Sequence, residues 1–224
     1  MRRFGRLLGR ILVFLLLAFL AIWLLAPDEP VDRVIGFESS TLGDDLDAWL
    51  AEQELQFSDI MPETGKRLVW AGSPGVRTPL AVIYVHGFSA TWHEIAPVPQ
   101  QVAAGLGANL FLTRLAGHGR GAAPMAEPVA GDWIEDMAEA MAIGRRLGER
   151  VLVIGTSTGG TLAVLAASDP ALSQGLAGVV LVSPNFGVAG AAGFLLDLPL
   201  VRHWGPLLAG ASQTFTPRSP DQAR

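Results

Sequence analysis

The chain has 224 residues, of which 50% are apolar and 17% are charged, so a folded domain with a sizeable core is expected rather than a disordered chain. It contains no cysteine, which excludes disulfides, thiolate metal sites and lipid-modified cysteines. The formal net charge is −5, and four of the 16 basic residues lie in the first ten positions, so nothing in the composition indicates nucleic-acid binding.

Residues 1–26 have the pattern of an N-terminal membrane anchor. The stretch 11–26 (ILVFLLLAFLAIWLLA) carries no charge, follows four arginines and extends on its N-terminal side to residue 7. A cleaved signal peptide is the alternative, but Leu24 would occupy a cleavage-site position that normally holds a small residue. We therefore predict a single membrane-spanning helix within residues 7–26. The arginines favour a cytoplasmic N-terminus and place the following domain on the extracytoplasmic side.

Residues 27–65 are predicted to be a linker followed by a lead-in helix. Residues 27–43 mix proline, acids and serine, whereas residues 44–55 (DDLDAWLAEQEL) have acids in the first turn and apolar residues at helical spacing.

From residue 66 onward, predicted strands and helices alternate. The strands are expected at 67–72, 79–87, 109–115, 150–155 and 177–184, and the helices at 94–107, 132–149 and 159–168. Strands joined by helices of this length form a mostly parallel sheet, with helices on both faces.

A Gly-x-Ser-x-Gly motif at residues 155–159 (GTSTG) lies between a predicted buried strand and a helix rich in small residues. This is the context of a nucleophile elbow, in which a very tight turn raises a serine hydroxyl above the edge of the sheet. Gly155 and Gly159 lack the Cβ atoms that would clash where the strand meets the helix. An ordinary glycine-rich turn is the alternative. A Walker phosphate loop is excluded, because no lysine follows.

A second stretch, YVHGFSATWHE at residues 84–94, ends an earlier strand. The loop after this strand is expected to face Ser157 across the same edge of the sheet. Acyl transfer needs two N–H donors, commonly the amide after the nucleophile and one amide from this earlier loop. The pair here would be the backbone N–H groups of Phe88 and Thr158.

The motifs HGF (86–88), RLAGHGR (114–120), GDW (131–133) and GTSTGG (155–160) resemble, in order and spacing, the serine aminopeptidase-like and monoglyceride-lipase-like branch of the α/β-hydrolase superfamily. The resemblance covers about residues 67–184 and implies an α/β-hydrolase core over residues 66–184. It implies Ser157 as nucleophile and the amides of Phe88 and Thr158 as the oxyanion hole, with no metal and no cofactor. His86 and His118 would be structural, because the general base of this family lies near the end of the chain.

The triad acid and histidine of that family have no convincing counterpart in this chain. In this fold they follow the serine in the order Asp or Glu, then His, and the family places both after two further strands. His203 is the only histidine after Ser157 and lies six residues beyond Asp197, a spacing more typical of one cap helix than of two loops. We therefore expect a chain truncated at its C-terminus that lacks the triad acid and histidine. Its C-terminal strands would be missing, and residues 185–224 would form the start of an incomplete cap.

The sequence thus predicts a membrane-anchored serine hydrolase of the carboxylesterase or lipase type, which cleaves small acyl-ester or lipid-like substrates through an acyl-enzyme. Hydrolysis of amide or peptide bonds is a subsidiary alternative, because the cap decides the substrate. The other alternative is a catalytically inactive hydrolase-like binding domain, or a fragment, because the triad Asp and His are absent.

Overall fold

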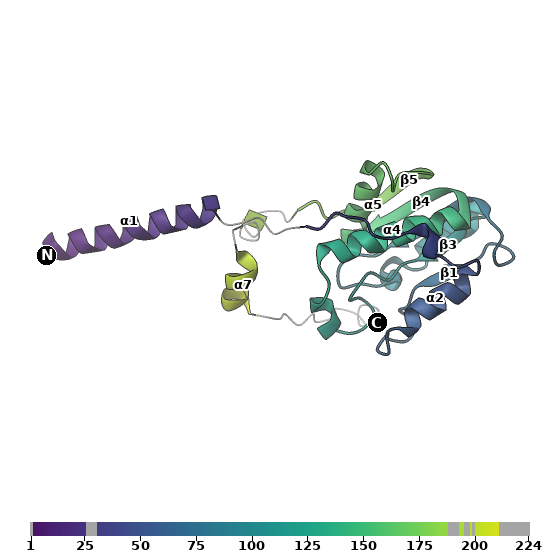
Figure 1. Cartoon of the computed structure of the whole chain (residues 1–224), viewed down its shortest axis with the longest axis horizontal. Coiled ribbons are helices and arrows are strands. Elements are labelled where there is room, and N and C mark those ends of the chain that lie inside the picture. Colours follow the sequence, from purple (N-terminus) through teal and green to yellow (C-terminus); the bar gives the residue numbers. More distant parts are fainter. Residues whose placement is uncertain (1, 26–30, 188–192, 195–197, 199, 211–224) are drawn as a thin grey trace. The chain divides into compact units, whose positions relative to one another are not determined.

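The computed structural model describes residues 2–25, 31–187, 193–194, 198 and 200–210 (Figure 1). Residues 31–186 form one compact unit. A second unit contains the helices α1 (Arg2–Leu25) and α7 (Val201–Ala209). The sequence separates residues 27–65 from the core as a predicted linker and lead-in helix. In the structure, residues 31–65 belong to the same compact unit as the strands.

A five-stranded sheet forms the centre of the larger unit. Its strands are β1 (Arg67–Val69), β2 (Thr78–Val85), β3 (Asn109–Leu112), β4 (Gly148–Thr156) and β5 (Leu176–Val182), in the order β1-β3-β2-β4-β5. Every neighbouring pair is parallel except β1 and β3, which are antiparallel. The predicted mostly parallel sheet is confirmed. Because parallel strands end at the same edge, the loops after β2, β3 and β4 are neighbours.

Helices cover both faces of the sheet, as the sequence predicts. The helices α2 (Leu46–Leu55), α4 (Ala130–Leu147) and α5 (Thr158–Ser168) contribute to one hydrophobic cluster, and α3 (Val98–Leu106) contributes to the other. Side chains alternate along β2: Ile83 and Val85 belong to the first cluster, and Val82 and Tyr84 to the second. This alternation follows from the period of two residues in a strand, and it buries β2 on both sides.

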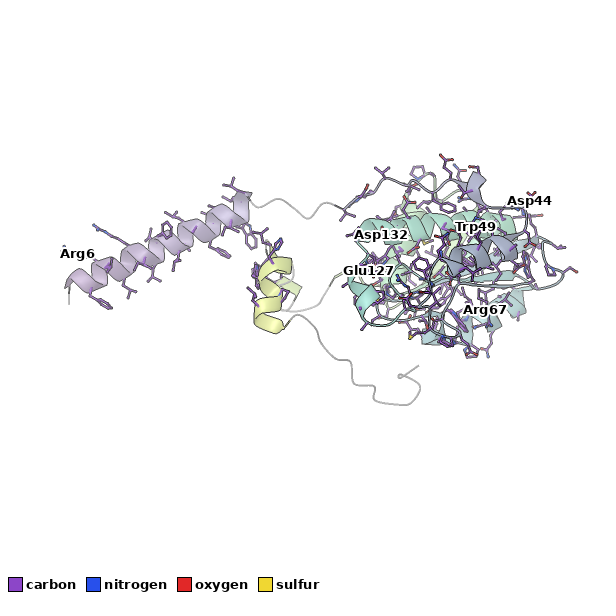
Figure 2. All side chains as sticks on the ribbon, turned by 60° about the horizontal axis from the view of Figure 1, so that its bottom comes forward. Arg6, Asp44, Trp49, Arg67, Glu127 and Asp132 are labelled. Carbon is purple, nitrogen blue, oxygen red and sulfur yellow. The ribbon has the colours of Figure 1, made fainter. Side chains whose placement is uncertain are left out.

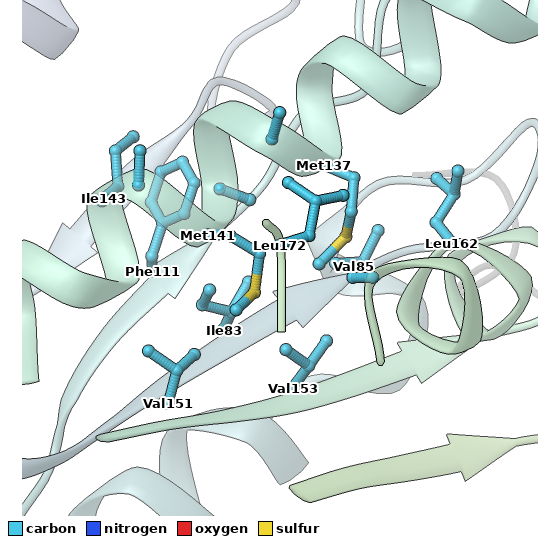
Figure 3. Close-up of a cluster of buried hydrophobic side chains, with 14 of the residues drawn as sticks. Ile83, Val85, Phe111, Met137, Met141, Ile143, Val151, Val153, Leu162 and Leu172 are labelled. Carbon is cyan, nitrogen blue, oxygen red and sulfur yellow. The ribbon is translucent and has the colours of Figure 1, made fainter. Parts of the chain in front are cut away.

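The larger cluster packs α4 onto the central strands (Figure 3). Met137 and Met141 of α4 lie in this cluster with the side chains of β2 and β4, and both methionines are fully buried. Burying one side chain of this size stabilises the fold by about 1.5–3 kcal/mol. Asp132 and Glu127 lie at the end of the unit where α4 begins, and Asp44 lies at the opposite end (Figure 2). The first turns of α4 adjoin the loop after β3, because Trp133 and Asp136 bond the backbone of Ala116 there.

One predicted helix differs from the structure. The sequence predicts a single helix over residues 94–107, whereas a 3₁₀ helix (Trp92–Ile95) comes first and α3 begins only at Val98. Pro97 and Pro99 lack the N–H groups that a helix interior needs, so both are accommodated at the start of α3 instead. Other short 3₁₀ helices lie at Ser39–Thr41 and Ala123–Ala126.

Helix α1 is long and apolar enough to cross a membrane. The span Phe4–Leu25 has 22 residues, with a mean hydropathy of 2.6 over an 18-residue window, and it begins before the residue 7 that the sequence suggests. At about 1.5 Å per residue it is about 33 Å long, which matches a hydrocarbon core of about 30 Å. A signal sequence near the N-terminus has the same length and composition. Of the predicted cap region, α7 is described and includes His203, whereas Asp197 lies outside the described residues.

Two helical glycines provide a matched test of the packing between α4 and the sheet. A Cβ atom at Gly144 of α4 would lie 2.6 Å from Ile83 Cδ1 and 3.1 Å from Val151 Cγ1, whereas a Cβ at Gly105 of α3 would meet nothing within 4 Å. We expect Gly144→Ala to lower the free energy of unfolding by about 1–2 kcal/mol, because overpacking outweighs the gain in helix propensity. Gly105→Ala should raise it by up to about 1 kcal/mol.

Chemical denaturation of the full-length variants in detergent measures both effects. A Gly144→Ala variant as stable as Gly105→Ala would contradict the close packing of α4 on β2 and β4.

Candidate active site

Ser157 occupies the turn between β4 and α5 in a strained backbone conformation. Its φ is 50° and its ψ is −114°, in the left-handed half of the Ramachandran map, which costs about 1–3 kcal/mol for a residue with a side chain. The Ser157 N–H donates to the carbonyl oxygen of Val182 (3.0 Å), and the Ser157 carbonyl oxygen accepts from the N–H of Asn185 (3.0 Å). The end of β5 and the segment after it therefore hold this turn, and Ser157 is half-buried.

The glycines of the motif are required by close backbone approach. A Cβ atom at Gly155 would overlap the carbonyl oxygen of Gly159, and a Cβ at Gly159 would overlap the carbonyl oxygen of Val85 at the end of β2. The second contact joins the first turn of α5 directly to the central strand. The steric reason that the sequence suggests for these glycines therefore applies to both positions.

The loop after β2 lies against Ser157. A Cβ atom at Gly87 would lie 3.1 Å from Ser157 Cβ, so the two turns are in van der Waals contact. Within residues 31–187, the backbone N–H groups of Phe88 and Thr158 donate no hydrogen bond. These are the two amides that the sequence assigns to an oxyanion hole, and the Phe88 side chain beside them is 55% exposed.

His86 is fully buried and connects the loop after β2 to the loop after β3. Its Nε2 accepts the N–H of Leu115 (3.1 Å), and its Nδ1 lies 2.8 Å from the carbonyl oxygen of Gly87. Since a backbone N–H only donates and a carbonyl only accepts, the ring is neutral with its proton on Nδ1. Burial lowers the pKa of His86 from 6.5 to about 3, which is consistent with a neutral ring.

His118 repeats this arrangement from the other loop. Its Nε2 accepts the N–H of Ser89 (3.1 Å), and its Nδ1 lies 2.9 Å from the carbonyl oxygen of Ala116. By the same reasoning the ring carries its proton on Nδ1, and burial lowers the pKa of His118. The centroids of the His86 and His118 rings are 4.9 Å apart. The structural interpretation of both histidines in the sequence analysis agrees with these contacts.

Three polar residues beneath the loop after β2 were missed by the sequence analysis. Glu94 Oε2 accepts the Gly87 N–H (2.9 Å) and the Tyr84 hydroxyl (3.0 Å), and that hydroxyl lies 3.1 Å from Thr156 Oγ1. Burial raises the pKa of Tyr84, so its hydroxyl stays protonated and able to donate. In the sequence Glu94 resembles an ordinary helix-start acid, and nothing in its spacing indicates these partners.

Helix α4 supports the loop after β3 through Ala116. Asp136 Oδ2 accepts the Ala116 N–H (2.6 Å), and Trp133 Nε1 donates to the Ala116 carbonyl oxygen (3.1 Å). Burial raises the pKa of Asp136 from 3.8 to about 6, opposed by the nearby positive charge of Lys66. The GDW motif at residues 131–133 contains the tryptophan that bonds Ala116, but no motif in the sequence indicates the role of the carboxylate one turn later.

Within residues 31–187, no histidine bonds the hydroxyl of Ser157. Both nitrogens of His86 and of His118 have backbone partners, and the His93 ring stacks on Trp92, with its Nδ1 3.3 Å from Thr91 Oγ1. The unit therefore presents a strained serine and two free amides, but no general base in contact with the serine.

Comparisons with known proteins agree with this fold. The family described as "Alpha/beta hydrolase family" matches residues 82–223, more than half of the chain. The thermostable monoacylglycerol lipase of Bacillus sp. (strain H-257) is 33% identical over 84 residues, which are 38% of this chain and 33% of that enzyme.

Two solved structures are similar to this chain, and the first of them shows the same fold. A structure reported for the metagenome-derived lipolytic enzymes LipS and LipT has 24% identity and a TM-score of 0.52, covering 61% of this chain and 52% of the other. Est1E from Butyrivibrio proteoclasticus with bound ferulic acid has 19% identity and a TM-score of 0.45, covering 54% and 48%. The chain thus spans a third of the length of the Bacillus lipase and about half of each solved structure.

The raised pKa of Asp136 predicts that the free energy of unfolding depends on pH, and that one substitution removes this dependence. The folded protein binds the Asp136 proton more tightly than the unfolded chain, so this stabilisation is complete below about pH 4 and is lost as the pH rises through about 6. Asp136→Asn keeps an acceptor for the Ala116 N–H and does not ionise. We expect the stability of the variant, relative to the wild type, to rise by up to about 3 kcal/mol between pH 4 and pH 8.

Denaturation of the wild type and of Asp136→Asn at each pH measures the difference between their free energies of unfolding. The titration of His86 cancels in this difference because both proteins contain His86. A difference that does not change with pH would contradict burial of an ionisable carboxyl group under the loop after β3.

Proposed function

Because the chain belongs to the alpha/beta hydrolase family, we propose that it is a membrane-anchored serine hydrolase that cleaves acyl esters. The observation that supports the proposal most is Ser157, which sits on a strained turn in contact with the loop after β2. In the proposed reaction its hydroxyl oxygen attacks the ester carbonyl carbon, and the alcohol leaves with a proton. Water then hydrolyses the acyl-enzyme and releases the carboxylic acid.

The N–H groups of Phe88 and Thr158 are the donors that we assign to the developing oxyanion. Both lack an acceptor within residues 31–187, and Thr158 is the first residue of α5, where the helix dipole adds positive potential. The Gly87 N–H is already bonded to Glu94, so it is not available for this role.

The general base comes, in this proposal, from outside residues 31–187. A serine hydroxyl is a weak nucleophile unless a histidine removes its proton, and the histidines of this unit make other contacts. Without such a base the domain would bind an acyl ligand but not cleave it. A hydrolase-like binding domain is therefore the second candidate function.

We propose a lipid-like acyl ester as the substrate class. The Bacillus relative is named a monoacylglycerol lipase. The exposed aromatic ring of Phe88 provides an apolar surface on the loop that contacts Ser157, and α1 would keep the domain at a membrane where such esters are concentrated.

The reactivity of Ser157 can be measured directly by mass. We expect a fluorophosphonate to add to Ser157 of the protein isolated from its native membrane, because the serine is only half-buried and its turn lies beside two amides without acceptors. The adduct should be absent from Ser157→Ala and unchanged in Ser168→Ala, which alters a serine at the far end of α5. Intact mass spectrometry and peptide mapping measure both results.

The native protein could have a mass larger than that calculated for these 224 residues and carry the adduct on Ser157. This result would support a longer protein that contains its own general base. A mass that matches 224 residues, with no adduct, would contradict the proposed hydrolase activity and favour the second candidate function, a hydrolase-like binding domain.

The membrane anchor is tested separately. We expect the native protein to retain residues 1–25 and to stay in the membrane pellet after alkaline carbonate extraction. Leu16→Arg should reduce that fraction, because an arginine at the centre of a span costs about 2.5–3.5 kcal/mol on the insertion scale, whereas Leu16→Ile should not. A mature N-terminus near residue 26 would show instead that the helix is a cleaved signal peptide.

A further inference from the structure

The two peptide planes that flank Phe88 are each held by one buried histidine. The Gly87 carbonyl faces Nδ1 of His86 at 2.8 Å, and the Ser89 N–H donates to Nε2 of His118 at 3.1 Å. A trans peptide is planar, and its C=O and N–H point in opposite directions. The contact with the Gly87 carbonyl therefore sets the direction of the Phe88 N–H, and the contact with Ser89 sets the plane on the other side of the same Cα.

The conformation of Ser89 shows that the second contact is needed. Its φ is 57°, in the left-handed region, although it is not a glycine. A lone serine in this conformation costs free energy, so it persists only where its surroundings require it. His118 supplies the acceptor that holds the Ser89 amide in place.

The tautomer of His118 is in turn set by the Ala116 carbonyl, which α4 holds in place. The Ala116 carbonyl accepts from His118 Nδ1 and from Trp133 Nε1, and the Ala116 N–H is bonded to Asp136. A carbonyl in this position requires the proton of His118 to be on Nδ1, which leaves Nε2 as the acceptor for Ser89. The rings of Phe88 and Trp133 pack against His118, each with a centroid distance of 5.9 Å, and restrict rotation of its ring.

We propose that His118 is a positioning residue of the active site: held by Ala116 as the Nδ1–H tautomer, it fixes the peptide after Phe88 and so keeps the preceding peptide, whose direction His86 sets, with its Phe88 N–H toward the oxyanion. This role rests on the proposed function, since it holds the Phe88 donor of the proposed oxyanion hole in place from the side of Ser89. His118 does not contact the reacting atoms. It acts through the backbone of the loop after β2, over 29 residues of sequence.

Two substitutions with amide side chains distinguish the roles of the two ring nitrogens of His118. In His118→Asn the amide nitrogen takes the place of Nδ1, so the bond to Ala116 is kept and the acceptor for Ser89 is lost. In His118→Gln the longer side chain brings an amide oxygen to the place of Nε2, so that acceptor is restored. A purely structural role in filling space would be disturbed about equally by both substitutions, whereas the positioning role separates them.

The first experiment does not depend on catalysis. Long-range ¹⁵N–¹H spectra of the full chain in detergent, with labelled histidines, should show His118 as neutral with its proton on Nδ1 at neutral pH. The Ser89 amide should exchange with solvent about 10- to 100-fold faster in His118→Asn, and at close to the wild-type rate in His118→Gln. The Phe88 amide resonance should shift in the first variant and return in the second. His93→Asn, in the 3₁₀ helix that follows this loop and with hydrogen bonds to Thr91 rather than Ser89, is the control and should change neither amide.

An Nε2–H or protonated His118, or Phe88 and Ser89 amides that are unchanged in His118→Asn, would overturn the proposal. If His118→Asn does not fold, the tautomer in the wild type and the amides in His118→Gln still decide it.

The second experiment connects the loop to the chemistry. The rate at which a fluorophosphonate modifies Ser157 should fall about 10- to 100-fold in His118→Asn and recover by at least about tenfold in His118→Gln, with no change in the concentration that gives half-maximal rate. Equal rates in the wild type and His118→Asn would overturn the positioning role while leaving the hydrolase intact. No modification of Ser157 in the wild type, with the expected tautomer and amide shifts, would contradict the proposed function but support the role of His118 in the loop.

Discussion

The close approach of α5 to the end of β2 is the constraint on which the candidate site depends. Gly159 lies so near the carbonyl oxygen of Val85 that no side chain fits between them. This contact allows the turn before α5 to rise directly beside the loop after β2, so that Ser157 and Gly87 meet. A bulkier residue at position 159 would push the helix away from the strand and separate the nucleophile from the amides beside it. The strain at Ser157 is tolerated because hydrogen bonds to Val182 and Asn185 hold its backbone on the side of β5.

Buried polar groups give the loops at this edge their shape. Loops after parallel strands have no ladder of their own, so their backbone groups need other partners. His86 and His118 provide these partners between two neighbouring loops, and Asp136 and Trp133 extend the network to α4. Each member is satisfied, which a buried network requires if it is to stabilise the fold. The low pKa of His86 and the raised pKa of Asp136 have the same cause, because burial favours the neutral form of each group.

Much of this organisation could be predicted from the sequence because its signals are local. The apolar runs and the helical spacing predicted each strand and most helix boundaries, and the Gly-x-Ser-x-Gly motif identified the turn after β4. The predicted start of α3 at residue 94 was wrong, since the spacing of apolar residues does not show where prolines interrupt a helix. The partners of Glu94 and Asp136 could not be predicted either. Each is one acid among 21 in the chain, and its role arises only from a contact with a distant loop.

The sequence by itself determined the fold class, the family motifs, the serine on its turn and an N-terminal helix apolar enough to span a membrane, since all of these depend on composition and short-range spacing. Only the tertiary structure decided which backbone groups are paired and which are free at the edge of the sheet. It showed that the Gly87 amide is bonded to Glu94, whereas the Phe88 and Thr158 amides have no acceptor within residues 31–187. It also placed the protons of both histidines on Nδ1. The reason is physical: hydrogen bonds between loops depend on distances of a few tenths of an ångström, which packing sets and sequence spacing does not.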